Sequence, residues 1–126
     1  MSRKAFFRLC LVSAVLAWTT RAAIIGSGAA ELIFDLRIER GRVAENMSVI
    51  RVKQRDVVRL RWSTDRPIVL HLHGYDIERK IEPGAIGVME FAAHSTGRFP
   101  VEVHRSSEAG GHSHGEAPLV RIEVYP

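Results

Sequence analysis

The feature that most constrains this chain is a strict alternation of apolar and polar side chains that begins at residue 31. In the segment "ELIFDLRIER", one face carries the apolar residues Leu32, Phe34, Leu36 and Ile38, and the other face carries charged residues. A period of two is typical of a half-buried β-strand. The segment therefore predicts a strand that covers an apolar core with one face.

The same alternation recurs along the rest of the chain, in segments 48–54, 56–63, 68–73, 86–93, 97–104 and 118–126. A loop leads from the fourth segment to a turn at Pro83-Gly84, and no stretch beyond residue 30 keeps a helical period. Short strands at such spacing predict an all-β protein, a Greek-key β-sandwich or barrel of about seven strands. Trp62 falls on a predicted inward face and is expected in the core.

The first thirty residues follow a different pattern. Basic residues come first, an apolar run from Leu9 to Trp18 follows, and small residues surround Ala22. This order is typical of a secretory signal peptide. We predict a signal peptide over residues 1–22, with cleavage near Ala22 or alternatively near Ala29, and one domain over residues 30–126. A retained N-terminal anchor is the alternative.

Removing that segment changes the charge and the cysteine content of the protein. The whole chain has 18 Lys and Arg against 14 Asp and Glu, and four of the basic residues but none of the acidic ones precede residue 22. The high pI therefore belongs to the signal segment and does not indicate a nucleic-acid partner. The single cysteine, Cys10, lies in the apolar run, so the predicted domain has no disulfide and no thiolate ligand.

Two of the six histidines, His71 and His73, lie one residue apart just before Gly74. Residues two apart in a strand point to the same face, about 7 Å apart. The two imidazoles can therefore share one cation, and imidazole suits copper, zinc, iron and nickel. The alternative is that one histidine is hydrogen-bonded in the core and the other is solvated.

The stretches "HLHG", "EPG", "VMEFAA" and "GRFPVEVH" follow one another between residues 71 and 104. This order resembles the cupredoxin fold of blue copper proteins and multicopper oxidases, over residues 32–125. The first stretch is similar to a copper-binding stretch of the oxidases. The chain is most similar in pattern to the small exported cupredoxin-like domains of the EfeO type, which are associated with bacterial iron and copper handling.

The chain departs from blue copper proteins at the thiolate position. Where their pattern has a cysteine, this chain has Val103, preceded by Glu102 and followed by His104. The loop over residues 105–118 contains no methionine. A blue His₂Cys centre therefore cannot form, and the resemblance implies a non-blue site.

The predicted metal site consists of His71, His73 and His104 with Glu102, which shares a face with His104. His112 and His114, in the Gly- and Ser-rich segment 105–118, are candidate auxiliary ligands, or alternatively solvated loop residues. Such donors suit copper, or alternatively zinc or iron. His94 is expected to be a surface turn residue.

The predicted function is metal capture, buffering or delivery by an exported copper-binding protein. Its partners would be the metal ion and a periplasmic or membrane metal-handling protein, and its location periplasmic or secreted, or anchored by an uncleaved N-terminal segment. The alternative is a metal-free structural or interaction module in a periplasmic or membrane-associated complex. No catalytic motif stands out, which argues against an enzyme; a redox activity at a non-blue copper is the third hypothesis.

Overall fold

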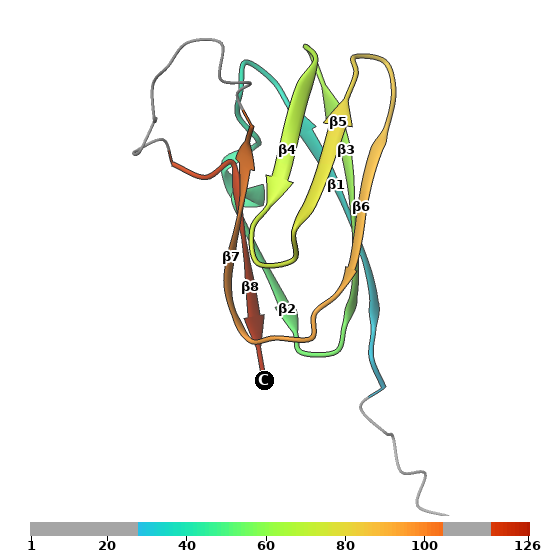
Figure 1. The fold of residues 1–126 in the computed structure, drawn as a ribbon, viewed down its shortest axis with the longest axis vertical. Helices are drawn as coiled ribbons and strands as arrows, with labels where there is room; N and C mark the ends of the chain where they lie inside the picture. Colours follow the sequence, from blue (N-terminus) through green and yellow to red (C-terminus); the bar gives the residue numbers. More distant parts are fainter. Residues whose placement is uncertain (1–27, 105–116) are drawn as a thin grey trace, which may run out of the picture.

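A computed structural model describes residues 28–104 and 117–126, which form two packed β-sheets (Figure 1). The predicted signal peptide, His112 and His114 lie outside these residues. In chain order the elements are β1 (Glu31–Ile38), the single-turn 3-10 helix η1 (Glu45–Met47), β2 (Val49–Lys53), β3 (Val57–Thr64), β4 (Ile68–Leu72), β5 (Ile77–Ile81), β6 (Gly87–Ala92), β7 (Gly97–Val103) and β8 (Val120–Tyr125). One sheet has the order β1-β3-β6, and the other has the order β2-β8-β7-β4-β5. No helix in the described ranges has the length and hydropathy of a membrane span.

The all-β prediction is confirmed, with eight strands in the described residues where about seven were expected. The additional strand is β5, which lies in the segment expected to be a loop. Its burial pattern explains the difference, because only Ile81 is buried and the three charged residues Glu78, Arg79 and Lys80 are exposed. β5 is the edge of its sheet and pairs with β4 alone among the described strands. Charged residues are common on such edges because they discourage pairing with other chains.

The core lies between the two sheets and consists of the alternate residues that the sequence pattern predicts. Val58, Leu60 and Trp62 of β3 are fully buried, as are Val120 and Ile122 of β8. The remaining members include Leu36, Ile38, Ile50, Val52, Leu70, Leu72, Ile81, Met89, Phe91, Val101 and Val124. Burial of these apolar side chains is the main contribution to the stability of a domain without a disulfide in its described part.

Two of the strand pairs are parallel and join distant parts of the chain. β1 pairs with β3, and β2 pairs with β8, so that Val49 lies opposite Arg121. β8 is the last strand of the chain, yet it lies inside the five-stranded sheet between β2 and β7. β1 and β2 are each at the edge of their own sheet.

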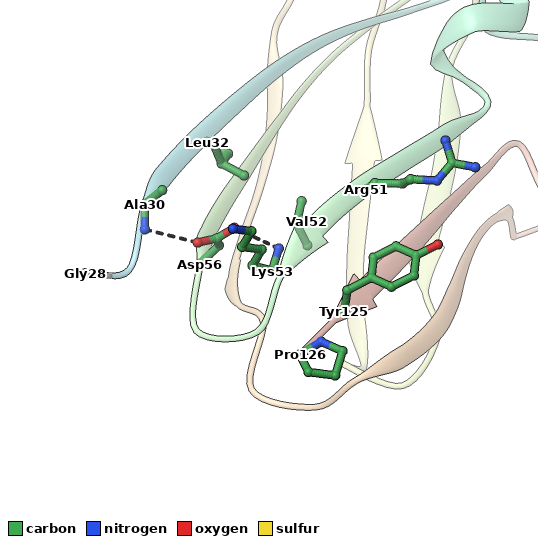
Figure 2. Close-up of a pocket in the computed structure, with 9 residues that line it drawn as sticks. All are labelled: Gly28, Ala30, Leu32, Arg51, Val52, Lys53, Asp56, Tyr125 and Pro126. Carbon is green, nitrogen blue, oxygen red and sulfur yellow. Dashed lines mark hydrogen bonds between the residues drawn. The ribbon is translucent and has the colours of Figure 1, made fainter. Parts of the chain in front are cut away.

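Asp56 lies in the tight turn between β2 and β3, and it connects the edge strands β1 and β2 at their lower ends. Its Oδ1 accepts a hydrogen bond from the backbone N–H of Ala30 at 3.1 Å, and its Oδ2 accepts one from the N–H of Lys53 at 2.8 Å (Figure 2). The residue is only 7% exposed. The carboxylate thus supplies acceptors for two backbone groups that the strand ladders leave free.

A second carboxylate, Glu123 of β8, organises the outer face of the five-stranded sheet. It lies in register between Arg98 of β7 and Arg51 of β2, with Nε to carboxylate-oxygen distances of 3.6 and 3.2 Å. The hydroxyl of Tyr125 donates a hydrogen bond to Glu123 Oε2 at 2.7 Å. This hydrogen bond, followed by the charges of Arg51, Arg98 and Arg121, lowers the pKa of Glu123 below its usual value.

We expect Glu123→Gln to destabilise the protein at neutral pH and to have little effect in acid. Because the folded protein lowers the pKa of this carboxyl, its ionised form adds stability above the pKa of the unfolded chain. That contribution is lost as the pH falls through the lower, folded-state pKa. Urea unfolding of both proteins from neutral pH to about pH 3 should therefore show two curves that converge on acidification. A constant difference over this range would contradict the assignment.

Candidate functional site

β4 carries the two central histidines on its outer face. His71 lies within the strand and His73 follows its last residue. Leu70, just before His71, and Leu72, between the two histidines, are fully buried. The predicted division of this segment into a core face and a histidine face is therefore confirmed. The two imidazole rings are in contact, with their centroids 4.2 Å apart and their planes inclined by 50°.

Carboxylates flank this ring pair on the neighbouring strands. In the sheet, His71 lies directly opposite Glu102 of β7 on one side and Glu78 of β5 on the other. The Nε2 atom of His71 is 3.3 Å from Asp76 Oδ1, and the Nε2 atom of His73 is 3.1 Å from Glu102 Oε2. We call these six side chains, which share one solvent-facing surface, the histidine–carboxylate face: His71, His73, Asp76, Glu78, Glu102 and His104.

His104, directly after β7, lies on this face but does not reach the ring pair. Its backbone N–H donates a hydrogen bond to the carbonyl of Val69 at 2.7 Å, and its Nδ1 lies 3.9 Å from Glu78 Oε2. Within residues 28–104 and 117–126, no three His, Asp or Glu side chains have their donor atoms gathered as in a metal site. The structure thus places His71 beside His73 and His73 beside Glu102, but it directs His104 to a different carboxylate.

Two acidic members of the face, Asp76 and Glu78, are not among the residues predicted from the sequence. Both belong to the segment after Gly74 that was expected to be a loop. Asp76 has a positive φ of 54° in the turn, and Glu78 lies in β5. Ile77 and Ile81, the two apolar residues at the ends of β5, are a weak signal for this strand.

Gly74 ends the histidine strand in a conformation that requires glycine. Its φ is +87°, and a Cβ at this position would lie 2.5 Å from Cδ1 of Phe99 in β7. The adjacent His73 donates its backbone N–H to the carbonyl of Pro100 at 3.0 Å. The tight packing of Gly74 against Phe99 therefore fixes the position of the backbone just after His73, at the end of β4.

We expect Gly74→Ala to lower the free energy of unfolding by about 2–3 kcal/mol, because it adds both backbone strain and a clash with an aromatic ring. Gly84→Ala is the matched control: its φ is +78°, but nothing lies within 4 Å of the added Cβ. The control should cost about 1 kcal/mol, from strain alone. Urea unfolding measures the free energy of unfolding of both variants. Equal losses would show that the Phe99 ring moves aside at no energetic cost.

Val103, at the position where the blue copper pattern has a cysteine, lies at the end of β7. It is paired with Leu70, so it is on the opposite face of the sheet from Glu102. There is no cysteine in the described part of the chain. The ligand-type side chains of the histidine–carboxylate face are therefore nitrogen and oxygen donors.

No family model matches this sequence, and no curated protein matches it. Several solved structures, however, are similar to this chain. The periplasmic domain of subunit II of cytochrome oxidase (CoxB) of Bradyrhizobium japonicum is similar with a TM-score of 0.56 and 18% identity, over 75% of this chain and 84% of that one. A heme-copper terminal oxidase dimer contains a chain with a TM-score of 0.57 and 19% identity, over 79% of this chain and 67% of that one.

A multi-copper oxidase from Pseudomonas Thermotolerans is similar with a TM-score of 0.56 and 20% identity, over 78% of this chain but only 30% of the oxidase. Together with the two mixed sheets, these likenesses define the fold as cupredoxin-like, as the resemblance in the sequence implied. At these identities, the likeness concerns the fold alone.

Proposed function

We propose that this protein is an exported cupredoxin-like domain that binds copper at a non-blue site on the histidine–carboxylate face, for metal capture, buffering or delivery. The observation that carries the proposal is the contact between the His71 and His73 rings with Glu102 beside them. Two imidazoles and a carboxylate are a donor set that suits Cu(II), and also Zn(II). The sequence resemblance to EfeO-type domains agrees with this proposal.

In this proposal, His71 and His73 supply the first two ligands and Glu102 the third. His104 is the fourth ligand in this proposal, which requires its side chain to turn away from Glu78. The Nδ1 atom of His104 lies 3.9 Å from Glu78 Oε2. His112 and His114, which lie outside the described residues, are candidates for the remaining positions. Without a thiolate, bound copper would be a non-blue centre, and iron is a further candidate for the same donors.

The location and the partner follow from the same proposal. A signal-like first segment and likeness to a periplasmic domain support a periplasmic or secreted protein. A protein that captures or delivers copper needs a second protein to exchange it with, so the proposed partner is a membrane or periplasmic metal-handling protein. No catalytic residue is proposed.

Titration of the metal-free full chain with Cu(II) and Zn(II) in a calorimeter tests the site. We expect His71→Ala, His73→Ala and Glu102→Gln each to weaken Cu(II) binding by about tenfold or more, the loss of one good ligand interaction. His94→Ala is the control, because His94 lies at a turn with its Nδ1 3.1 Å from the carbonyl of Ala92. Unchanged affinity in all three site variants would refute the proposed site.

A metal-free interaction module is the second candidate function. It is favoured by the carboxylates that already partner the histidines, Asp76 for His71 and Glu102 for His73. In that case, neither Cu(II) nor a chelator would change the melting temperature. A rise in melting temperature with Cu(II) that His71→Ala abolishes would exclude this alternative, since only ligands that bind the folded state stabilise it.

A further inference from the structure

The edge strands β1 and β2 border a seam between the two sheets, and β1 is open along this edge. The two strands do not close onto each other, because a cavity of about 620 Å³ lies between them at the lower end of the seam (Figure 2). Within residues 28–104 and 117–126, no strand or loop group forms a backbone hydrogen bond with the outer edge of β1. β1 is also longer than the other edge strands β2, β5 and β6. A long free edge is a template for pairing with another chain.

Hydrogen bonds at the two ends of β1 show which backbone groups lie on the free edge. The C=O of Ala30 accepts a hydrogen bond from the N–H of Val57 at 2.8 Å, and the C=O of Ile38 accepts one from the N–H of Asp65 at 3.3 Å. Because successive residues of a strand direct their N–H and C=O groups to opposite sides, the even-numbered residues of β1 bond to β3. The odd-numbered residues therefore present their N–H and C=O groups to the free edge: Glu31, Ile33, Asp35 and Arg37.

Apolar side chains lie on both faces of this edge. Leu32 and Phe34 face the core side but are only half-buried, whereas Leu36 on the same side is 2% exposed. On the solvent side, Ile33 is 51% exposed, although it is a large apolar residue. A second strand paired with β1 would remove part of this apolar surface from water, which is favourable.

We propose that β1 pairs in antiparallel fashion with β1 of a second copy of this chain, so that the two three-stranded sheets become one continuous sheet. Phe34 then lies opposite Phe34 of the second copy at a two-fold axis, and Glu31 lies opposite Arg37 on each side of it. The odd-numbered residues occupy the hydrogen-bonded positions of this ladder, so their free N–H and C=O groups bond across the interface. Such self-complementary pairing about a two-fold axis is the commonest symmetry of protein oligomers.

Charge selects this register over the neighbouring ones. The free backbone groups require odd-numbered residues to lie opposite one another, so one strand can slide past the other only by two residues at a time. A slide in one direction places Glu31 opposite Asp35, and a slide in the other direction places the two Asp35 side chains opposite each other. Like charges directly opposite are unfavourable, whereas the proposed register has two Glu31–Arg37 pairs.

The ion pairs that these side chains form within one chain are compatible with the dimer. Glu31 lies 3.2 Å from Arg59, and Arg37 contacts Glu39, with all four side chains at least one-third exposed. A carboxylate has two acceptor oxygens and a guanidinium has five N–H donors, so each group can keep its own partner and also meet the other across the interface. Asp35 likewise keeps Arg61 at 3.2 Å.

Sedimentation velocity of the metal-free full chain over a series of concentrations tests the dimer. For a small edge-to-edge interface we expect a Kd between about 1 µM and 1 mM. Glu31→Arg and Arg37→Glu should each weaken the dimer by about tenfold, because each sets like charges opposite one another on both sides of the axis. Arg79→Glu, a charge reversal at an exposed position of the edge strand β5, should leave the Kd unchanged.

Mixing the two variants gives the sharper result. In a dimer of one Glu31→Arg chain with one Arg37→Glu chain, both charge pairs are again of opposite sign. The mixture should therefore form a heterodimer about as tight as the dimer of the unchanged protein, and about tenfold tighter than either variant alone. Only a surface that sets position 31 opposite position 37 predicts this recovery.

Amide hydrogen exchange identifies the backbone groups that pair. The N–H groups of Ile33 and Asp35 should exchange more slowly as the concentration rises through the Kd, because they become hydrogen-bonded only in the dimer. The N–H groups of Leu32 and Phe34 point to β3 and should change little.

Other outcomes would overturn the proposal. These are a protein that stays monomeric up to about 1 mM, a dimer that neither charge reversal weakens, a mixture of the two variants that associates no better than each alone, and Ile33 and Asp35 amides that gain no protection. Because no metal is added and the histidine–carboxylate face belongs to the other sheet, none of these outcomes depends on the copper site.

Discussion

Replacing Trp62 with alanine is expected to lower the free energy of unfolding by about 3–5 kcal/mol, the largest effect of any single substitution considered for this protein. Trp62 lies in β3 with no exposed surface and is the largest fully buried side chain of the core. Its removal would leave a cavity between the two sheets that the surrounding side chains cannot fill. Urea unfolding followed by far-ultraviolet circular dichroism measures the loss without relying on the indole fluorescence.

Trp62→Phe is the matched variant, and it should be much milder. The indole Nε1 of Trp62 is buried and has no hydrogen-bond partner among the described residues. A buried donor without a partner costs about 1–3 kcal/mol, and phenylalanine removes that donor while it keeps most of the ring volume. We therefore expect a loss below about 1.5 kcal/mol. Losses of similar size in Trp62→Phe and Trp62→Ala would show that Nε1 is satisfied or that the indole shape is essential.

The second large effect is expected for Asp56→Ala, which should lower the free energy of unfolding by about 2–4 kcal/mol. The substitution removes a buried acceptor and leaves the N–H groups of Ala30 and Lys53 without partners. Because these groups belong to the start of β1 and the end of β2, the lower end of the seam should also open. Urea unfolding gives the free energy, and amide hydrogen exchange at Ala30 and Lys53 reports the local opening.

Asp65→Ala is a suitable control for this experiment. Asp65 also accepts a backbone hydrogen bond in a turn, from the N–H of Arg40 at 2.8 Å, but it is exposed to solvent. Water can replace the lost acceptor there, so the loss should stay near about 1 kcal/mol or less. If both aspartates gave the same loss, burial of the Asp56 carboxylate would not be the cause.

Most of the fold could be predicted from the sequence because the sandwich buries one face of nearly every strand. A buried face imposes alternation, and alternation is visible in β1, β3 and β8 without any knowledge of their neighbours. β5 was missed for the same reason: as an edge strand with a single buried residue, Ile81, it carries almost no alternation. The parallel pairing of β2 with β8 has no local signature at all.

Only the part of the site that lies on a single strand could be predicted from the sequence. His71 and His73 share a face because they are two residues apart, and the structure confirms that geometry. Which carboxylates lie beside them depends on the register between β4, β5 and β7, which the pattern of a single strand does not specify. For this reason Glu78 was not foreseen, and the expected approach of His104 to the ring pair is not observed.

The central place of β8 in the five-stranded sheet has a consequence for how the chain folds. Because Val49 must find Arg121, the chain has to close a loop over most of the domain before this sheet can exist. Topologies rich in such distant contacts fold in about milliseconds to seconds rather than microseconds. During synthesis, β2 leaves the ribosome long before its partner does, so this sheet cannot be completed until translation reaches the last strand.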